Sequence, residues 1–287
     1  MEASEDPQPW KDYVSSDTPF QELARLKEEG WSNPAGDEFF KKRRHCVVKA
    51  NHRARLGLYR MTQEVCDGLA SATGLLDLYG TSSPRILDLC MAPGGFSMTS
   101  KKRLPRSIID AITLPTELDG YQVMSPEIFN EVIYADITMF AQEMAPGDAD
   151  RYLSEHPDPA KFHTARPYLE NKYDVVFCGG TVCKNHPREE YRSVDCEAPR
   201  LWASEPLFAL NRLKPSGSLV LLLHRVQSWS TVCLIHAFSQ FSDVQLFEHP
   251  KFHSIKSSFY LVARNIDLEN ETAKIFEWHS TAVLKAI

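Results

Sequence analysis

Short apolar runs alternate with longer amphipathic or mixed segments over most of this chain. The apolar runs predict strands, which in chain order are 85–89, 107–112, 131–134, 173–178, 219–223, 245–247 and 258–262. Helical spacing and stop signals predict helices at about 56–80, 196–213, 229–241 and 266–287. Strands that alternate with helices predict a parallel sheet with helices on both faces.

The strands differ in character along the chain. The strand at 85–89 is short and apolar, which is typical of a parallel strand buried on both faces. The two late strands follow the turn signal at Gly217 and predict an antiparallel strand near one edge. We therefore expect an α/β fold of the Rossmann-like type, with a mostly parallel sheet and an antiparallel late strand. In such a sheet the ligand lies beyond the carboxyl ends of the strands.

The same pattern divides the chain into three parts. Residues 1–45 are polar, contain prolines and become basic, and we interpret them as an N-terminal arm with a helix at about 20–29. Residues 46–265 carry the strands and form one domain, in which the aperiodic stretch 138–172 is interpreted as an insertion. Residues 266–287 are interpreted as a C-terminal helical extension.

Charge limits the classes of partner. The 287-residue chain has a net charge of −6, so it has no basic field over its whole surface, and nucleic-acid contact requires a local basic patch. Such a patch is compatible with phosphate contacts, with a solvated helix face or with the surface of a partner chain. The candidate residues are Lys41, Lys42, Arg43, Arg44, Lys49, Arg53, Arg55 and Arg60.

Cysteine usage and hydropathy bear on the compartment. The seven cysteines form no CxxC pair, which favours reduced thiols over a disulfide framework or a zinc site. The first residues lack the apolar stretch of a signal peptide, and no run approaches the roughly 20 apolar residues that span a bilayer. We therefore expect a cytoplasmic or nuclear protein without a metal site and without membrane contact.

The segment ILDLCMAPGGFS, residues 86–97, has the composition of a nucleotide-type site. Gly94 and Gly95 let the backbone approach a ligand without a Cβ clash, and Pro93 stiffens the turn. The loop amides and the start of the following helix can donate to a carboxylate, and Asp88 can accept from an ammonium group. A ligand that carries both groups is an amino acid, and methionine attached to adenosine fits. A Gly-Gly loop alone is also typical of a plain turn.

The longer string DLCMAPGGFS resembles the first motif of the FtsJ-like family, ribose 2′-O-methyltransferases that act on ribosomal RNA and mRNA caps. The resemblance continues in order over about residues 50–265. Its further segments are IYADI around Asp136, YDVVFCGG up to Gly180, LKPSGSLVLLL up to Leu223, and SSFYLVARN up to Asn265. The resemblance implies a methyltransferase fold and S-adenosyl-L-methionine as the cofactor.

The resemblance also implies cofactor-binding positions. Asp136 aligns with the acidic residue that contacts the adenine amino group, and Gly179 ends the fourth predicted strand. The family's ribose-binding acid aligns near Ile112, and Asp110 is the nearby candidate. The implied loop residues are Asp88, Leu89, Cys90, Ala92, Pro93, Gly94, Gly95, Phe96 and Ser97.

The chain departs from the family at the catalytic Lys-Asp-Lys-Glu tetrad. The first lysine aligns near Arg60, with Lys49 as a looser candidate. The remaining positions read Gly179, Leu222 and Ser258. Leucine can neither donate nor accept a proton, so the tetrad is degenerate here.

Substitutes for the lost groups lie close to these positions. His224 shares a strand face with Leu222 and has an imidazole that titrates near neutral pH, although it can also simply close the strand. Lys184 follows the fourth strand on a loop that should face the active site, and Lys256 precedes the last strand. Lys184 can equally lie on a solvated loop, and an ordinary solvated side chain is the favoured interpretation of Lys256.

Three functions remain open at this stage. The first is methyl transfer to a small-molecule acceptor, such as a phenol, amine or thiol, with a non-standard catalytic set. The second is RNA ribose 2′-O-methylation with a rebuilt active site. The third is a catalytically inactive, methyltransferase-like subunit that binds a partner chain or regulates.

Overall fold

The computed structural model describes residues 6–38, 52–155, 159–182, 194–254 and 256–286. The strands form one mixed sheet in the order β3-β2-β1-β4-β5-β7-β6. The first five strands pair in parallel, and β7 is antiparallel to both β5 and β6. The predicted fold class is therefore confirmed. The strands are β1 Arg85–Leu89, β2 Ile108–Thr113, β3 Glu131–Tyr134, β4 Tyr173–Cys178, β5 Leu213–His224, β6 Asp243–Phe247 and β7 Ser258–Arg264.

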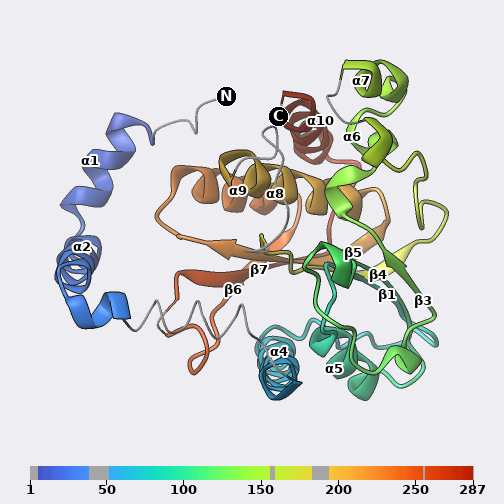
Figure 1. Cartoon of the computed structure of the whole chain (residues 1–287), viewed down its shortest axis with the longest axis horizontal. Coiled ribbons are helices and arrows are strands. Elements are labelled where there is room, and N and C mark those ends of the chain that lie inside the picture. Colours follow the sequence, from blue (N-terminus) through green and yellow to red (C-terminus); the bar gives the residue numbers. More distant parts are fainter. Residues whose placement is uncertain (1–5, 39–51, 156–158, 183–193, 255, 287) are drawn as a thin grey trace.

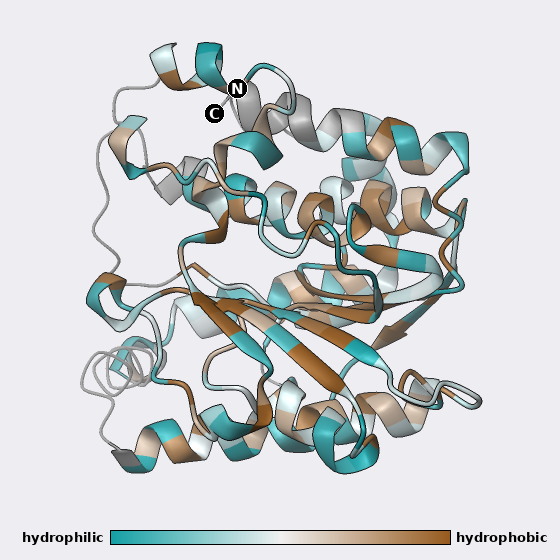
Figure 2. Ribbon diagram, turned by 90° about the vertical axis from the view of Figure 1, so that its right-hand side faces the viewer, coloured by the Kyte–Doolittle hydropathy of each residue, from teal (hydrophilic) through white to brown (hydrophobic). Residues whose placement is uncertain are grey.

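Helices cover both faces of the sheet (Figure 1). Helices α4 and α5 lie on one face, and α8, α9 and α10 lie on the other. Neighbouring residues of β1 point to opposite sides, since Ile86 belongs to the core under α4 and Leu87 to the core under α8 and α9. The sheet is accordingly hydrophobic between more polar helices (Figure 2). The helices are α4 His52–Thr73, α5 Gly95–Arg103, α8 Val194–Leu210, α9 Trp229–Ser239 and α10 Glu271–Ala286.

Helix α4 is shorter at its C-terminal end than the predicted helix 56–80. It ends at Thr73 because Gly74 adopts a left-handed conformation with φ +65°, a common helix terminator. Leu75 and Leu76 are buried after the helix has ended. Because their apolar side chains fit the helical spacing, the predicted helix was continued beyond Thr73, where α4 in fact ends.

Strand β5 begins at Leu213, well before the predicted strand 219–223. The Pro-x-Gly signal lies inside it rather than in a turn. Tyr173 pairs with Leu213 and Val175 with Ser218, so β5 carries extra residues that bulge out of the ladder. Ser216, with φ +60°, marks the irregularity.

The predicted insertion 138–172 contains short helices that pack on α8. Met144 and Phe162 share a buried cluster with Ala203 and Leu207 of α8. Glu143 pairs with Arg166 and with the buried Arg212, and these contacts anchor the segment. The short elements are η3 Ile137–Met139, α6 Ala141–Met144, α7 Ala149–Glu155 and η4 Pro159–Lys161. Between β2 and β3 lie η1 Thr116–Leu118 and η2 Pro126–Ile128.

The N-terminal arm carries α1 Gln8–Ser16 and α2 Thr18–Trp31, which lie to one side of the sheet (Figure 1). The sequence predicted only the second helix. Neither helix has a buried residue, and α1 is only 9 residues long, which is short for a helix to be identified from its apolar pattern. No helix in the described part of the chain is long and apolar enough to cross a membrane.

Candidate functional site

A cavity of about 380 Å³ opens at the carboxyl ends of the parallel strands. This is where the topology predicts a ligand, since the strand order reverses between β1 and β4. The residues after β1, β2 and β3 line one half, which we name the β1–β3 half. The residues after β4 and those of β5, β7 and the loop before β7 line the other, which we name the β4–β7 half. Leu58, Met61 and Thr62 of α4 and Glu197 and Leu201 of α8 complete the wall.

Asp88 lies at the end of β1 and lines the cavity, although only 4% of it is exposed. Ser97 Oγ donates a 2.5 Å hydrogen bond to its Oδ2. Burial raises the pKa of Asp88 to about 7, against the lowering effect of the Ser97 bond. A cation placed in the cavity would favour the ionised form. Asp88 is therefore suited to hold an ammonium group.

The two loop glycines have different roles. Gly94 has φ +97°, a left-handed conformation, and caps α5. A Cβ on Gly95 would lie 2.0 Å from Thr62 Oγ1 and 2.8 Å from the carbonyl oxygen of Tyr59. Gly95 lines the cavity but is also required by the close contact between α4 and α5, a role that the sequence did not indicate.

Hydrogen bonds tie the loop after β1 to β2. The backbone N–H of Met91 donates to the carbonyl of Ile112 at 3.1 Å, and that of Ala92 donates to Thr113 Oγ1 at 3.2 Å. Cys90, with φ +56°, begins the loop. Cys90, Ala92, Pro93 and the following Phe96 line the cavity, as the motif predicts for a ligand-contacting loop. The loop is thus fixed before any ligand binds.

Asp136 lines the β1–β3 half and caps the short helix η3. Its Oδ1 accepts from the backbone N–H of Thr138 at 2.9 Å and from Thr138 Oγ1 at 2.8 Å. Ile137 lines the cavity beside it. The arrangement fixes a carboxylate next to an apolar surface that can accept a flat ring.

Asp110 does not line the cavity in the described part of the chain. It is fully buried within β2, where Arg85, Asn130 and Tyr173 all hydrogen-bond to its carboxylate at 2.7 to 2.8 Å. These contacts give it a structural role inside the sheet. The cavity wall at the end of β2 is instead made of Ile112, Thr113, Leu114, Gly120 and Tyr121, so Ile112, the position aligned with the family's ribose-binding acid, does line the cavity.

A second buried carboxyl lies next to the end of β4. Gly179 lines the cavity, and the backbone N–H of the next residue, Gly180, donates to Glu205 Oε1 at 2.8 Å. Burial raises the pKa of Glu205 to about 8. Glu205 projects from α8, and its sequence context is that of an ordinary helix, so the sequence gave no signal of this contact.

Two histidines and a lysine line the β4–β7 half. Leu222 and His224 both face the cavity, as their shared strand face predicts. Burial lowers the pKa of His224, and the positive charges of Arg225 and Lys256 add to the shift. His253 also lines the cavity and, unlike the more exposed His224, is buried; it lies in a loop without any periodic signal. Ser258 and Tyr260 of β7 lie on the same side.

The remaining predicted residues lie elsewhere. Arg60 is exposed on α4 and is not among the described residues that line the cavity. Leu89 and Ser97 likewise are not among the described residues that line the cavity. Ser97 contacts the site indirectly, through its hydrogen bond to Asp88. Lys184 and Lys49 fall outside the described residues. No described group of three or more His, Cys, Asp or Glu side chains is placed to hold a metal ion.

Fold and cavity together define an α/β protein with a cavity at the carboxyl ends of a mostly parallel sheet. The family model of the FtsJ-like methyltransferases matches residues 69–266. The chain therefore belongs to the FtsJ-like methyltransferase family. These enzymes depend on S-adenosylmethionine, which is the cofactor that membership implies.

Solved structures show distant likenesses. A protein named as a ribosomal RNA methyltransferase from Plasmodium falciparum is 14% identical, with a TM-score of 0.43, covering 70% of this chain and 96% of that chain. Human methyltransferase-like protein 13, solved in complex with SAH, is 16% identical, with a TM-score of 0.40, covering 79% and 90%. An rRNA methylase from Streptococcus thermophilus is 11% identical, with a TM-score of 0.39, covering 69% and 96%. A search of curated proteins finds no match. The family membership rests on the family model.

Proposed function

We propose that this chain binds S-adenosylmethionine in the β1–β3 half of the cavity and transfers its methyl group to an acceptor held in the β4–β7 half. The observation that carries the proposal is Asp88, a buried carboxyl that faces the cavity at the end of β1 beside a glycine loop. A carboxyl in that place is costly unless it is neutral or paired with a cation.

The residues of the β1–β3 half fit this cofactor. Asp88 suits the amino group of its methionine part, because that group is a cation. Asp136 and Ile137 offer a carboxylate and an apolar surface to the adenine. When bound, the cofactor supplies a methyl group activated by a positively charged sulfur.

The chain's own contribution is to place the acceptor and take its proton. Holding the two reactants side by side removes much of the entropic barrier to a bimolecular reaction. His224 is the described group best suited to accept a proton, because its lowered pKa keeps the imidazole neutral at physiological pH. Leu222 replaces the family's central lysine, which favours an acceptor that needs little help to ionise.

Incubation with methyl-labelled cofactor tests the function. RNA and pools of small molecules would be incubated with the purified chain and the products separated. We expect label in a small-molecule fraction and at least a tenfold loss of rate in His224→Gln, since general base catalysis typically contributes about 10²–10⁴-fold. His236→Gln, an exposed histidine on α9 outside the cavity, is the matched control.

The other outcomes separate the alternatives. Label in RNA alone would replace the small-molecule acceptor by an RNA ribose and point to the basic residues of α4, such as the exposed Arg53. Absence of label from every pool, with cofactor still bound, would identify a non-catalytic binding subunit. The first result would contradict the small-molecule acceptor, and the second would contradict methyl transfer itself.

A further inference from the structure

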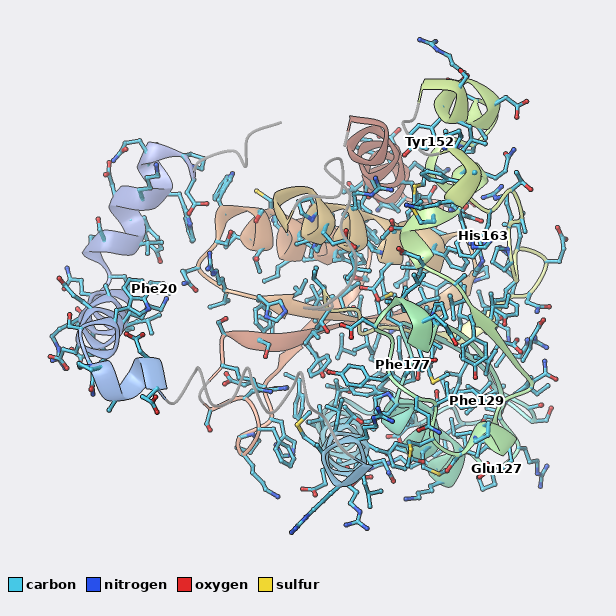
Figure 3. All side chains as sticks on the ribbon, in the orientation of Figure 1. Phe20, Glu127, Phe129, Tyr152, His163 and Phe177 are labelled. Atoms are coloured by element: carbon cyan, nitrogen blue, oxygen red, sulfur yellow. The ribbon has the colours of Figure 1, made fainter. Side chains whose placement is uncertain are left out.

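The β4–β7 half of the cavity, together with Phe96 at the start of α5, combines an aromatic wall with hydrogen-bond donors. Phe96, Phe177 and Tyr260 all line the cavity, and the ring of Phe96 contacts the rings of the other two. The ring centroid of Phe96 lies 5.2 Å from that of Phe177 and 5.5 Å from that of Tyr260. Phe177 projects from β4 toward the α4 and α5 side of the sheet (Figure 3). A flat apolar acceptor would find ring contacts on this wall.

His253 extends the wall and adds a donor of fixed orientation. Its ring centroid lies 5.5 Å from that of Tyr260, and only 4% of the residue is exposed. The backbone N–H of His249 donates to His253 Nδ1 at 3.2 Å. A nitrogen that accepts a hydrogen bond carries no proton, so the neutral ring carries its proton on Nε2. His253 can therefore donate from Nε2 but cannot act as a base there.

Lys256 places a positive charge beside both imidazoles. It lines the cavity, and its backbone N–H donates to the carbonyl of His253 at 2.8 Å, which fixes the two residues relative to each other. Burial lowers the pKa of His253, and the charge of Lys256 lowers it further. The described carboxylates that line the cavity, Asp88, Asp136 and Glu197, come from β1, from the residues after β3 and from α8. The wall around His253 therefore favours an anionic oxygen.

We propose that the β4–β7 half of the cavity and the adjoining Phe96 form a subsite for a phenolic acceptor, whose ring lies on the Phe96, Phe177 and Tyr260 wall and whose oxygen is held as the phenolate by His253 Nε2 and Lys256 Nζ. The inference rests on the proposed function and names its substrate class. The phenol O–H breaks and its proton passes to the imidazole of His224. The oxygen then forms the new bond to the methyl carbon, and the electron pair of the broken carbon–sulfur bond stays on sulfur.

A phenol also resolves the loss of the family's lysine. A phenol ionises with a pKa near 10, whereas an aliphatic ribose hydroxyl is much less acidic and needs a stronger base. Imidazole is a weak base, so His224 can remove the phenol proton only when hydrogen-bond donors stabilise the phenolate that forms. His253 and Lys256 both donate to that oxygen in the proposed subsite.

The test uses 4-nitrophenol, whose phenol and phenolate forms absorb at different wavelengths. The probe would be titrated with pH in the presence of the full chain saturated with S-adenosylhomocysteine. We expect the pKa of the bound probe to fall by about one unit, a tenfold shift toward phenolate. His253→Phe keeps the ring but removes the donor, and it should abolish most of the shift. His253→Gln, which retains an N–H donor, should restore part of it.

Lysine variants provide the second arm. Lys256→Met should also reduce the shift and weaken binding of the probe by about tenfold. Lys251→Met is the matched control, since Lys251 pairs with Glu64 at 3.1 Å and does not line the cavity. Its titration should equal that of the parent chain.

Each failure has its own meaning. Binding of S-adenosylhomocysteine without binding of the probe, or probe binding with an unshifted or raised pKa, overturns the phenolic subsite and leaves the proposed function standing. Competition by a short RNA but not by other phenols overturns it in favour of a ribose acceptor. Failure of S-adenosylhomocysteine itself to bind removes the proposed function and the subsite together.

Discussion

The indole N–H of Trp10 donates a 2.9 Å hydrogen bond to the backbone carbonyl of Gln227, 217 residues further along the chain. The ring of Trp10 also lies 5.5 Å from that of Trp229, and the backbone N–H of Trp229 donates to Asp6 Oδ1 at 3.0 Å. Helix α1 is thus attached to the loop that follows His224. The N-terminal arm therefore supports the β4–β7 side of the cavity.

Removal of this attachment should loosen the loop after His224. One hydrogen bond and one aromatic contact contribute about 1–2 kcal/mol together, so Trp10→Ala should speed local opening about 5- to 30-fold. Hydrogen exchange of the amides at 225–231 measures this directly. Trp10→Phe keeps part of the ring contact and should show a smaller effect. Unchanged exchange in Trp10→Ala would show that α1 does not restrain the loop.

A buried ion network should stabilise the inserted segment. Glu143 accepts from Arg212 at 2.5 Å and from Arg166 at 3.0 Å, and Arg212 is fully buried. Loss of the carboxylate leaves the Arg212 charge uncompensated, which typically costs about 3–5 kcal/mol. We expect Glu143→Gln to lower the free energy of unfolding by that amount in urea. A loss below about 1 kcal/mol would contradict the structural role of the network.

The matched control is an exposed ion pair. Lys274 and Glu269 lie 2.9 Å apart at the surface, where water and salt screen their attraction. Glu269→Gln should therefore leave the free energy of unfolding nearly unchanged. The difference between the two variants isolates the effect of burial.

Glu205 should make the ligand-free protein less stable at alkaline pH. Its folded pKa is about 8, above the unfolded value near 4.3, so the folded chain holds the proton more tightly. The stability that this provides is complete below the unfolded pKa and is lost as pH rises through 8. Between pH 5 and pH 8 the loss approaches about 3–4 kcal/mol. Thermal unfolding at both values measures it.

Glu205→Gln should remove this dependence on pH. The amide oxygen can still accept the Gly180 N–H, and the side chain has nothing to ionise. The variant should therefore be more stable than the parent chain at pH 8 and lose that advantage at pH 5. Equal slopes for the two proteins would show that Glu205 does not titrate in this range.

Cofactor affinity should rise with pH through the titration of Asp88. Its pKa is about 7 in the ligand-free cavity, and only the ionised form attracts an ammonium group. Between pH 6 and pH 8 the affinity for S-adenosylhomocysteine should rise about tenfold, since one proton must leave. Asp88→Asn should bind weakly with a flat profile. Asp110→Asn, whose carboxyl lies inside the sheet, should keep the slope, and a flat profile there would place Asp110 at the ligand instead.

The strands and the cofactor loop were predictable because both depend on local sequence. The strand at Glu131–Tyr134 was predicted with its observed bounds, and residues 88–97 form the predicted strand end, loop and helix start. The bounds of β5 were missed, because its bulge depends on pairing with Tyr173 and Val175. The local sequence pattern, Pro215 to Gly217, predicts a turn at these residues instead.

Contacts made across the sheet could not be predicted. Glu205 reaches Gly180 from a helix, and His253 enters the cavity from an irregular loop, so neither has a spacing that identifies it. Asp110 was a candidate for the ribose by its closeness in sequence to the strand end. The structure buries it among Arg85, Asn130 and Tyr173, because it lies three residues before the carboxyl end of β2 and contacts the first residues of β1 and β4.

The central claim is that the cavity beside Asp88 binds the cofactor, and calorimetric titration of the purified chain with S-adenosylhomocysteine tests it most directly. We expect one molecule bound per chain, and loss of binding in Asp88→Ala while circular dichroism shows the variant folded. Absence of binding to the folded parent chain at millimolar ligand, or unchanged affinity in Asp88→Ala, would contradict the claim.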